Sequence, residues 1–147
     1  MTLKLDAQRV RNYTSKQMGD ACEMLIAAEM TLAGVPALKA PDYWPGYDIV
    51  AQPRDQPPQR ISVKSRTFKR GSAFVSYSAV DVFDWLAIVL LPGDGAPSRR
   101  IFVIPRHVAD EAARTYSTEK MANVREYRID EVAQKFSAYE NNFRLAV

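Results

Sequence analysis

The most regular pattern in the chain is a stripe of apolar side chains between residues 15 and 33. Their positions repeat at the three- and four-residue steps of one helix face: Met18, Cys22, Leu25, Ile26, Met30, Leu32 and Ala33. Thr14, followed three residues later by Gln17, has the spacing of a capping box, and Gly34 with Pro36 supplies a stop. The pattern predicts one long helix near the N-terminus.

Two shorter segments, residues 47–52 and 60–66, alternate polar and apolar side chains as half-buried strands do. The proline-rich segment between them is typical of a turn, so the two strands are expected to form a hairpin. If the hairpin folds about Asp55 or its neighbour, Asp48 faces Ser62 or Lys64, and all three share one face of the sheet. The opposite face then carries apolar side chains suited to a core: Ile49, Ala51, Ile61 and Val63.

The remaining segments carry weaker patterns. Residues 85–91 form a continuous apolar run, which is typical of the buried strand at the middle of a sheet. Residues 73–78 alternate and are either an edge strand or part of a basic loop, and residues 1–13 are either a short helix or a loose arm. We also expect strands at 35–39 and 100–104, helices at 105–115 and 129–136, and an irregular segment at 116–128 with a last strand near Tyr127 and Ile129.

This order of elements predicts an α/β or α+β fold. One long N-terminal helix would pack on a central mixed sheet of about four or five strands, the first of which are linked by a hairpin. A length of 147 residues is typical of one domain, so we expect residues 1–147 to form a single unit.

The cysteine count and the hydropathy of the chain exclude several classes of protein. Cys22 is the only cysteine, so the chain has neither an intramolecular disulfide nor a cysteine-based zinc site. The first residues lack the apolar run of a signal peptide, and no segment approaches the ~20 apolar residues of a membrane helix. We therefore expect a soluble, cytoplasmic protein with no membrane partner.

The formal net charge is only +3, but the positive charges are unevenly distributed. Between Asp55 and Asp81 there is no acidic residue, and that segment contains five basic ones: Arg60, Lys64, Arg66, Lys69 and Arg70. Such a basic strip favours binding of a polyanion. The alternative is a solvated face that protects an edge strand.

Three charged residues near the hairpin are candidates for a site. Glu23 borders the apolar stripe of the predicted helix, so its carboxylate either reaches toward the sheet or lies at a solvated rim. Asp48 and Lys64, taken alone, favour a plain cross-strand ion pair, and it is Glu23 and the basic strip that shift the interpretation toward a site.

Taken in order, these residues resemble a known arrangement. Gly19 and Glu23 stand on the helix, Asp48 begins a strand, Ser62-Val63-Lys64 lie in the next strand, and an apolar strand follows from Trp85. This order resembles the PD-(D/E)XK nuclease superfamily, in particular its small members similar to Holliday-junction resolvases and restriction-endonuclease-like proteins. The resemblance spans roughly residues 15 to 105 and implies a restriction-endonuclease-like core.

The resemblance also implies an activity, which is hydrolysis of phosphodiester bonds in DNA with Mg²⁺ or Mn²⁺. It makes Asp48 the principal metal ligand and the backbone carbonyl of Val63 a second one, while Glu23 contributes through water or steadies the site. Lys64 would orient the attacking water and stabilise charge on the phosphate. The basic residues Arg60, Arg66, Lys69 and Arg70 would hold the DNA backbone, and relatives of this kind often act as a homodimer.

The sequence departs from the superfamily at Ser62, where the signature has Glu or Asp and often Gln. A neutral hydroxyl supplies little charge to a metal ion. Three alternatives follow: Glu23 takes over the missing carboxylate's role, Ser62 holds a metal-bound water, or the domain is a non-cleaving nuclease fold that binds nucleic acid or a protein partner.

Overall fold

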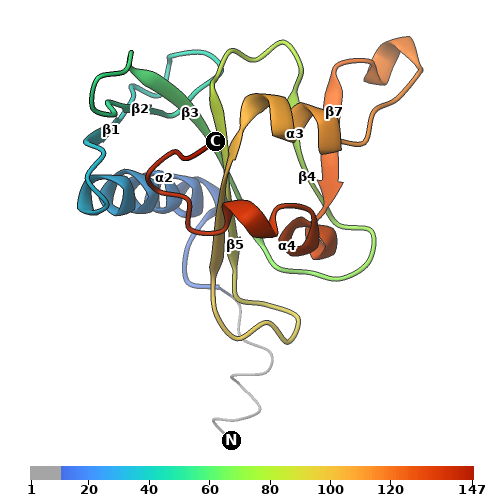
Figure 1. Cartoon of the computed structure of the whole chain (residues 1–147). Coiled ribbons are helices and arrows are strands. Elements are labelled where there is room, and N and C mark those ends of the chain that lie inside the picture. The colour runs from blue at the N-terminus through green and yellow to red at the C-terminus, as the bar shows by residue number, and fades with distance from the viewer. Residues whose placement is uncertain (1–10) are drawn as a thin grey trace, which may run out of the picture.

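The computed structural model describes residues 11–147 (Figure 1). Its helices are α2 (Ser15–Leu32), α3 (Arg106–Ala112) and α4 (Val132–Lys135). Its strands are β1 (Ala37–Lys39), β2 (Ile49–Ala51), β3 (Gln59–Thr67), β4 (Phe74–Ser78), β5 (Trp85–Leu91), β6 (Arg100–Pro105) and β7 (Val124–Arg128). The helix or arm predicted for residues 1–13 falls mostly on residues 1–10, which lie outside the described residues.

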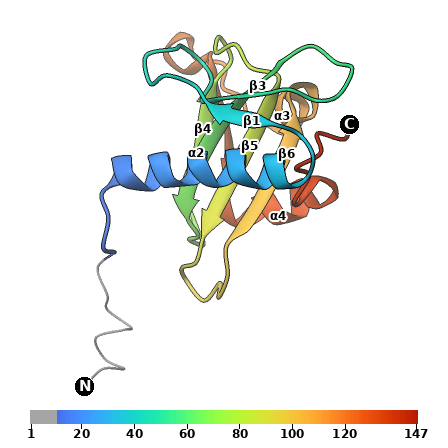
Figure 2. The same cartoon turned by 90° about the vertical axis from the view of Figure 1, so that its left-hand side faces the viewer.

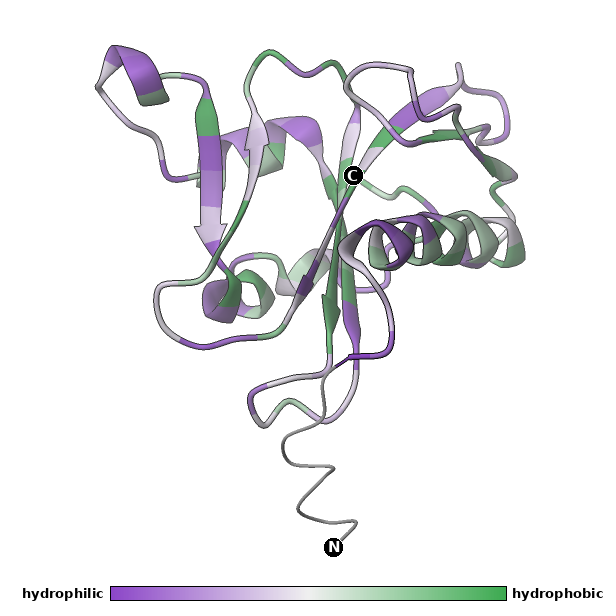
Figure 3. Cartoon of the chain, turned by 180° about the vertical axis from the view of Figure 1, so that it is seen from behind, coloured by the Kyte–Doolittle hydropathy of each residue, from purple (hydrophilic) through white to green (hydrophobic). Residues whose placement is uncertain are grey.

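Helix α2 begins and ends as its sequence predicts. The Thr14 hydroxyl accepts from the Gln17 backbone at 3.1 Å, the Gln17 side chain accepts from the Thr14 backbone at 2.9 Å, and Gly34 adopts a φ of 102° just past the helix end. In Figure 3 its ribbon alternates between purple and green, as expected for an amphipathic helix. Within residues 11–147, no helix combines the length and the apolar character needed to cross a membrane.

One residue of the predicted apolar stripe is misplaced. Leu32 is 83% exposed, whereas Met18, Cys22, Ile26 and Met30 are buried. Six residues separate Leu32 from Ile26, and at 100° per residue this step turns Leu32 away from the buried face. The buried stripe therefore runs through Met30 and stops before the last turn.

The central sheet has five strands in the order β1-β2-β3-β5-β6. Its neighbours are antiparallel except for β3 and β5, which are parallel, so the predicted mixed sheet is confirmed. The predicted hairpin is also confirmed, and Ile49 pairs with Ile61 within it. The middle strand is β3, however, and not residues 85–91 as predicted: β5 lies one place further along, buried on both faces between β3 and β6.

Each face of this sheet packs against a separate layer. Helix α2 covers one face and lies across the strands (Figure 2). On this face Ile26 joins the buried side chains of Ile61, Val63 and Ala87. The other face carries Leu86 and its neighbours from β5 and β6, which pack against β4, β7, α3 and α4. The alternation in β3 therefore sends Val63 toward α2, and it places Ser62 in register with Leu86 on β5.

The second half of the chain differs most from the prediction. Residues 74–78 form strand β4, one of the two predicted alternatives, and it pairs with β7 in a separate two-stranded antiparallel sheet. Strand β7 contains Tyr127, where a last strand was predicted, but it begins at Val124, within the segment expected to be irregular. Helix α3 ends at Ala112 because Ala113 is extended, and Arg114 then bridges to Glu126 beside β7. The predicted helix at 129–136 is a 3₁₀ turn, Ile129–Glu131, followed by the short α4.

Candidate active site

Asp48 lies at the point where strands β2 and β3 part. The Asp48 backbone N–H still donates to the carbonyl of Ile61 at 2.8 Å, but the paired residues of β2 begin only at Ile49, while β3 continues to Thr67. The N–H of Val63 points to the edge that β2 has left, and it donates to the Asp48 Oδ2 at 2.7 Å. Because both backbone groups of a strand residue point to the same edge, the Val63 carbonyl faces this edge as well.

The chemical environment of Asp48 combines burial with a neighbouring cation. Burial raises the pKa of the Asp48 carboxyl, and the hydrogen bond from Val63 and the charge of Lys64 oppose that rise in the pKa only in part. Lys64 is therefore close enough to act on Asp48, as the predicted hairpin requires. Ser62 is only 3% exposed and lies beside them within the sheet.

Glu23 approaches the same place from helix α2. Its side chain is 17% exposed, so the alternative of a solvated rim carboxylate is wrong. Burial raises the pKa of the Glu23 carboxyl, and the negative charge of Asp48 raises this pKa further. The two carboxylates line one pocket of about 290 Å³ together with Lys16, Gly19, Asp20 and Asp42, which we call the acidic pocket.

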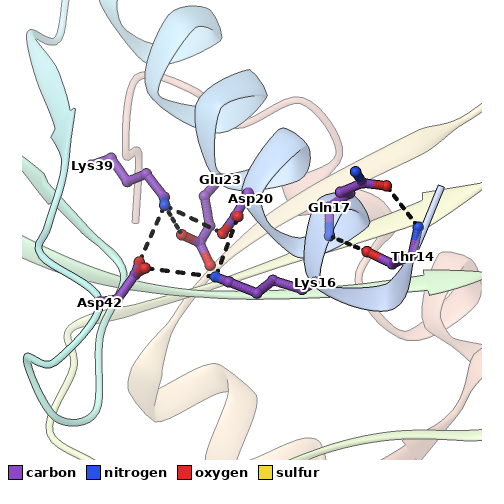
Figure 4. Close-up of polar contacts among 7 residues, drawn as sticks. All are labelled: Thr14, Lys16, Gln17, Asp20, Glu23, Lys39 and Asp42. Carbon is purple, nitrogen blue, oxygen red and sulfur yellow. Dashed lines mark hydrogen bonds and ion pairs between the residues drawn. The ribbon is translucent and has the colours of Figure 1, made fainter.

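A cluster of ion pairs at this pocket is a feature that the sequence analysis missed. The Lys39 Nζ lies 3.2 Å from Asp42, 3.3 Å from Asp20 and 3.4 Å from Glu23 (Figure 4). Lys16 bridges Asp20 and Asp42 at 3.4 and 3.6 Å. The spacing of Lys16, Asp20 and Glu23 indicates a shared helix face, but nothing in the sequence shows that Lys39 and Asp42 meet it.

Replacing Lys39 with Met is expected to destabilise the chain at neutral pH and to do so less in acid. Lys39 lowers the pKa of Asp42 and opposes the rise in the pKa of Glu23, so its contribution is present while these carboxyls are ionised and is lost as they gain protons. Thermal unfolding of both proteins should show a Tm difference that is full above about pH 6 and shrinks toward pH 3.

The control for this substitution is Lys69→Met, which removes an exposed lysine far from the three carboxylates in sequence. Its Tm should stay close to that of the wild type throughout the range. A deficit of Lys39→Met that is the same at every pH would show that lost packing, and not the ion pairs, causes the destabilisation.

The predicted basic strip is divided by acidic partners from other segments. Arg60 makes two side-chain hydrogen bonds of 3.1 Å to Asp84, and Arg70 hydrogen-bonds to Asp94 through its backbone N–H at 2.8 Å and through its guanidinium. Lys69 is exposed. Of the four basic residues predicted to hold nucleic acid, Arg66 is the one that the structure places at the candidate site.

Arg66 and Lys64 line a second depression, of about 560 Å³, along the edge of β3 that β2 leaves open. Arg11, Ser15, Gly19 and Val63 also line it, and we call it the basic groove. Arg11 had no signal in the sequence, because it reaches the groove from the segment that precedes α2. The structure thus sets an acidic pocket and a basic groove side by side.

Comparisons with known proteins bear on the fold. No protein-family model and no curated protein matches the sequence. Two solved structures are similar at 16% identity: a bacterial homing endonuclease, with a TM-score of 0.55 over 90% of both chains, and the Holliday junction resolvase Hjc of Archaeoglobus fulgidus, with a TM-score of 0.48 over 79% of this chain and 92% of the other. The likeness to the homing endonuclease shows a shared architecture, and the chain therefore has the restriction-endonuclease-like fold that the resemblance to PD-(D/E)XK nucleases predicted.

Proposed function

We propose that this protein is a metal-dependent nuclease that hydrolyses phosphodiester bonds in DNA, with Mg²⁺ or Mn²⁺ as its cofactor. The observation that carries the proposal is the position of Asp48. Its carboxylate fills the gap between β2 and β3, is fixed by the Val63 N–H, and lies within reach of the charges of Lys64 and Glu23. The fold shared with a homing endonuclease supports it.

The donor atoms at the acidic pocket suit a hard divalent cation. The Val63 N–H holds Asp48 through one carboxylate oxygen, Oδ2, so the second oxygen is available to bind a metal ion. Glu23 and the Val63 carbonyl would add further oxygen ligands. Burial is the main cause of the raised pKa of both Asp48 and Glu23, and repulsion from the charge of Asp48 raises the pKa of Glu23 further. A bound divalent cation would relieve that repulsion, neutralise charge on the phosphate and lower the pKa of an attacking water.

The residues around these ligands would act on the substrate. The Lys64 ammonium, held beside Asp48, would stabilise the negative charge that develops on the phosphate during attack. Arg66 and Arg11 in the basic groove would hold neighbouring phosphates of the same strand through contacts that weaken with salt. Position and charge, not a covalent intermediate, would supply the catalysis.

The departure at Ser62 fits this scheme when Glu23 supplies the second carboxylate. Ser62 is buried beside Leu86 and carries no charge, whereas Glu23 enters the acidic pocket from α2 and interacts with Asp48.

One observation favours the second candidate, a non-cleaving protein that binds nucleic acid or a protein partner. The Lys39 ammonium lies 3.4 Å from Glu23 and would compete with a metal ion for its carboxylate.

A cleavage assay separates the two candidates. Purified protein is incubated with supercoiled plasmid, branched DNA and single-stranded DNA in Mg²⁺, in Mn²⁺ and in EDTA. We expect strand cleavage with either ion and none in EDTA, with cleavage falling as salt rises because phosphate contacts are screened. Binding of labelled DNA without cleavage in either ion would favour the non-cleaving alternative and contradict the nuclease proposal.

A further inference from the structure

Gly19 stands at the junction of the acidic pocket and the basic groove. It is the fifth residue of α2 and contributes to the lining of both depressions. Below it, the two are joined by the hydrogen bond between Asp48, which lines the acidic pocket, and Val63, which lines the basic groove. The two depressions therefore adjoin at this residue.

Nothing in the local structure requires a glycine at position 19. Gly34 and Gly46 have φ values of 102° and 84°, which disfavour any side chain, but Gly19 does not share this conformation. A Cβ built on Gly19 would meet no atom of the described residues within 4 Å. Glycine inside a helix also lowers helix stability relative to alanine. The missing side chain thus leaves open space beside α2, and it lowers the stability of the helix.

The charges on the two sides of Gly19 indicate what this space would hold. Lys64, Arg66 and Arg11 would attract phosphates on one side. On the other side, the carboxylates of Asp48 and Glu23 would hold the metal ion that the proposed function requires beside a phosphate. A polyanion that runs from the groove to the carboxylates past the residue shared by both depressions would pass Gly19. Any longer side chain there would project into that path.

We infer that Gly19 keeps open a passage through which the sugar–phosphate backbone of one nucleic acid strand crosses α2, from the basic groove to the acidic pocket. This inference rests on the proposed nuclease function. It adds Gly19 as a positioning residue, which has no side chain that could bind the metal ion or a phosphate. It predicts that side-chain length at position 19 decides how well the strand is seated.

The test compares Gly19→Ala and Gly19→Leu with Ala28→Leu, which places the same side chain on an exposed position of α2 outside both depressions. All three proteins are assayed for Tm, for affinity to a labelled DNA duplex in EDTA, and for cleavage in Mg²⁺. We expect Gly19→Ala to raise the Tm by about 3 °C because alanine favours the helix. Gly19→Leu should keep the wild-type Tm or exceed it, yet bind DNA about tenfold more weakly and cleave it about 100-fold more slowly.

The outcomes distinguish this inference from the proposed function. Wild type and Ala28→Leu should bind and cleave alike, and a Gly19→Leu protein that is stable and equally active would overturn the passage while leaving the nuclease proposal intact. A wild type that neither binds nor cleaves DNA would overturn both. If Gly19→Leu lowers the Tm, the smaller substitutions Gly19→Ala and Gly19→Ser decide instead. If both of these proteins are stable and cleave DNA as fast as the wild type, the passage is contradicted.

Discussion

Asp48→Asn is expected to reduce Mg²⁺-dependent cleavage by about 10³-fold or more, because the substitution removes the charge of the proposed principal metal ligand. The amide oxygen of asparagine can still accept the hydrogen bond from the Val63 N–H, so the junction of β2 and β3 should stay intact. Initial rates of plasmid nicking over a range of Mg²⁺ concentrations measure the effect.

The stability of Asp48→Asn provides an independent check with a defined sign. Burial raises the pKa of Asp48 above that of an ordinary carboxyl, so ionised Asp48 costs stability at neutral pH, and that cost diminishes as the pH falls through the raised pKa. The neutral amide removes the cost, and the variant's Tm at pH 7 should equal or exceed that of the wild type. His107→Ala is the matched control, because His107 lies on α3 and lines a different pocket, so this variant should cleave DNA normally. Cleavage by Asp48→Asn within tenfold of the wild type would exclude Asp48 as the principal ligand.

Lys64→Met is expected to lower the cleavage rate about 100-fold while it changes DNA affinity only slightly. The charge of Lys64 acts on Asp48, beside which the proposed mechanism places the developing charge of the phosphate, so its effect should be concentrated in the transition state. Methionine keeps the length and the apolar stem of the side chain. Single-turnover rates at saturating protein separate the rate of cleavage from the affinity.

Lys69→Met is the control for Lys64→Met, because Lys69 is an exposed lysine just beyond β3. If the Lys69 side chain contacts DNA, Lys69→Met should weaken DNA binding and reduce the salt dependence of the affinity by about one phosphate contact. The cleavage rate of this variant should be unchanged. Equal losses of rate in the two variants would mean that Lys64 serves as one more phosphate contact and has no role in the chemical step.

The parts of the fold that the sequence predicted are those whose signals are local. The Thr14 and Gln17 capping box fixes the start of α2, and the alternation of residues 47–52 and 60–66 across one turn fixes the hairpin with Ile49 opposite Ile61. Asp48 and Lys64 came close together as predicted, because a register set by a short turn determines which side chains face each other.

Predictions were incomplete or wrong where a strand depends on a distant partner. A last strand was predicted near Tyr127, but neither its start at Val124 nor its pairing with β4 was predicted. Residues 124–128 carry no strong strand pattern, and they form β7 because β4, about fifty residues earlier in the chain, offers a free edge and a shared core beside Phe136. The parallel pairing of β3 with β5, which makes β3 and not β5 the middle strand, is set in the same way. Strand propensity reflects such packing more than the intrinsic preference of each residue.

The sequence by itself determined α2, the hairpin and the proximity of Asp48 to Lys64, because helix caps, turns and periodicity act between residues that are near in the chain. The tertiary structure alone decided the charges around the site: Lys39 and Asp42 join Glu23, while Asp84 and Asp94 take Arg60 and Arg70 out of the basic strip. The physical reason is that a charge interacts with whatever lies within a few ångströms in space, and the packing of α2 and the sheet, not the order of residues, sets those neighbours.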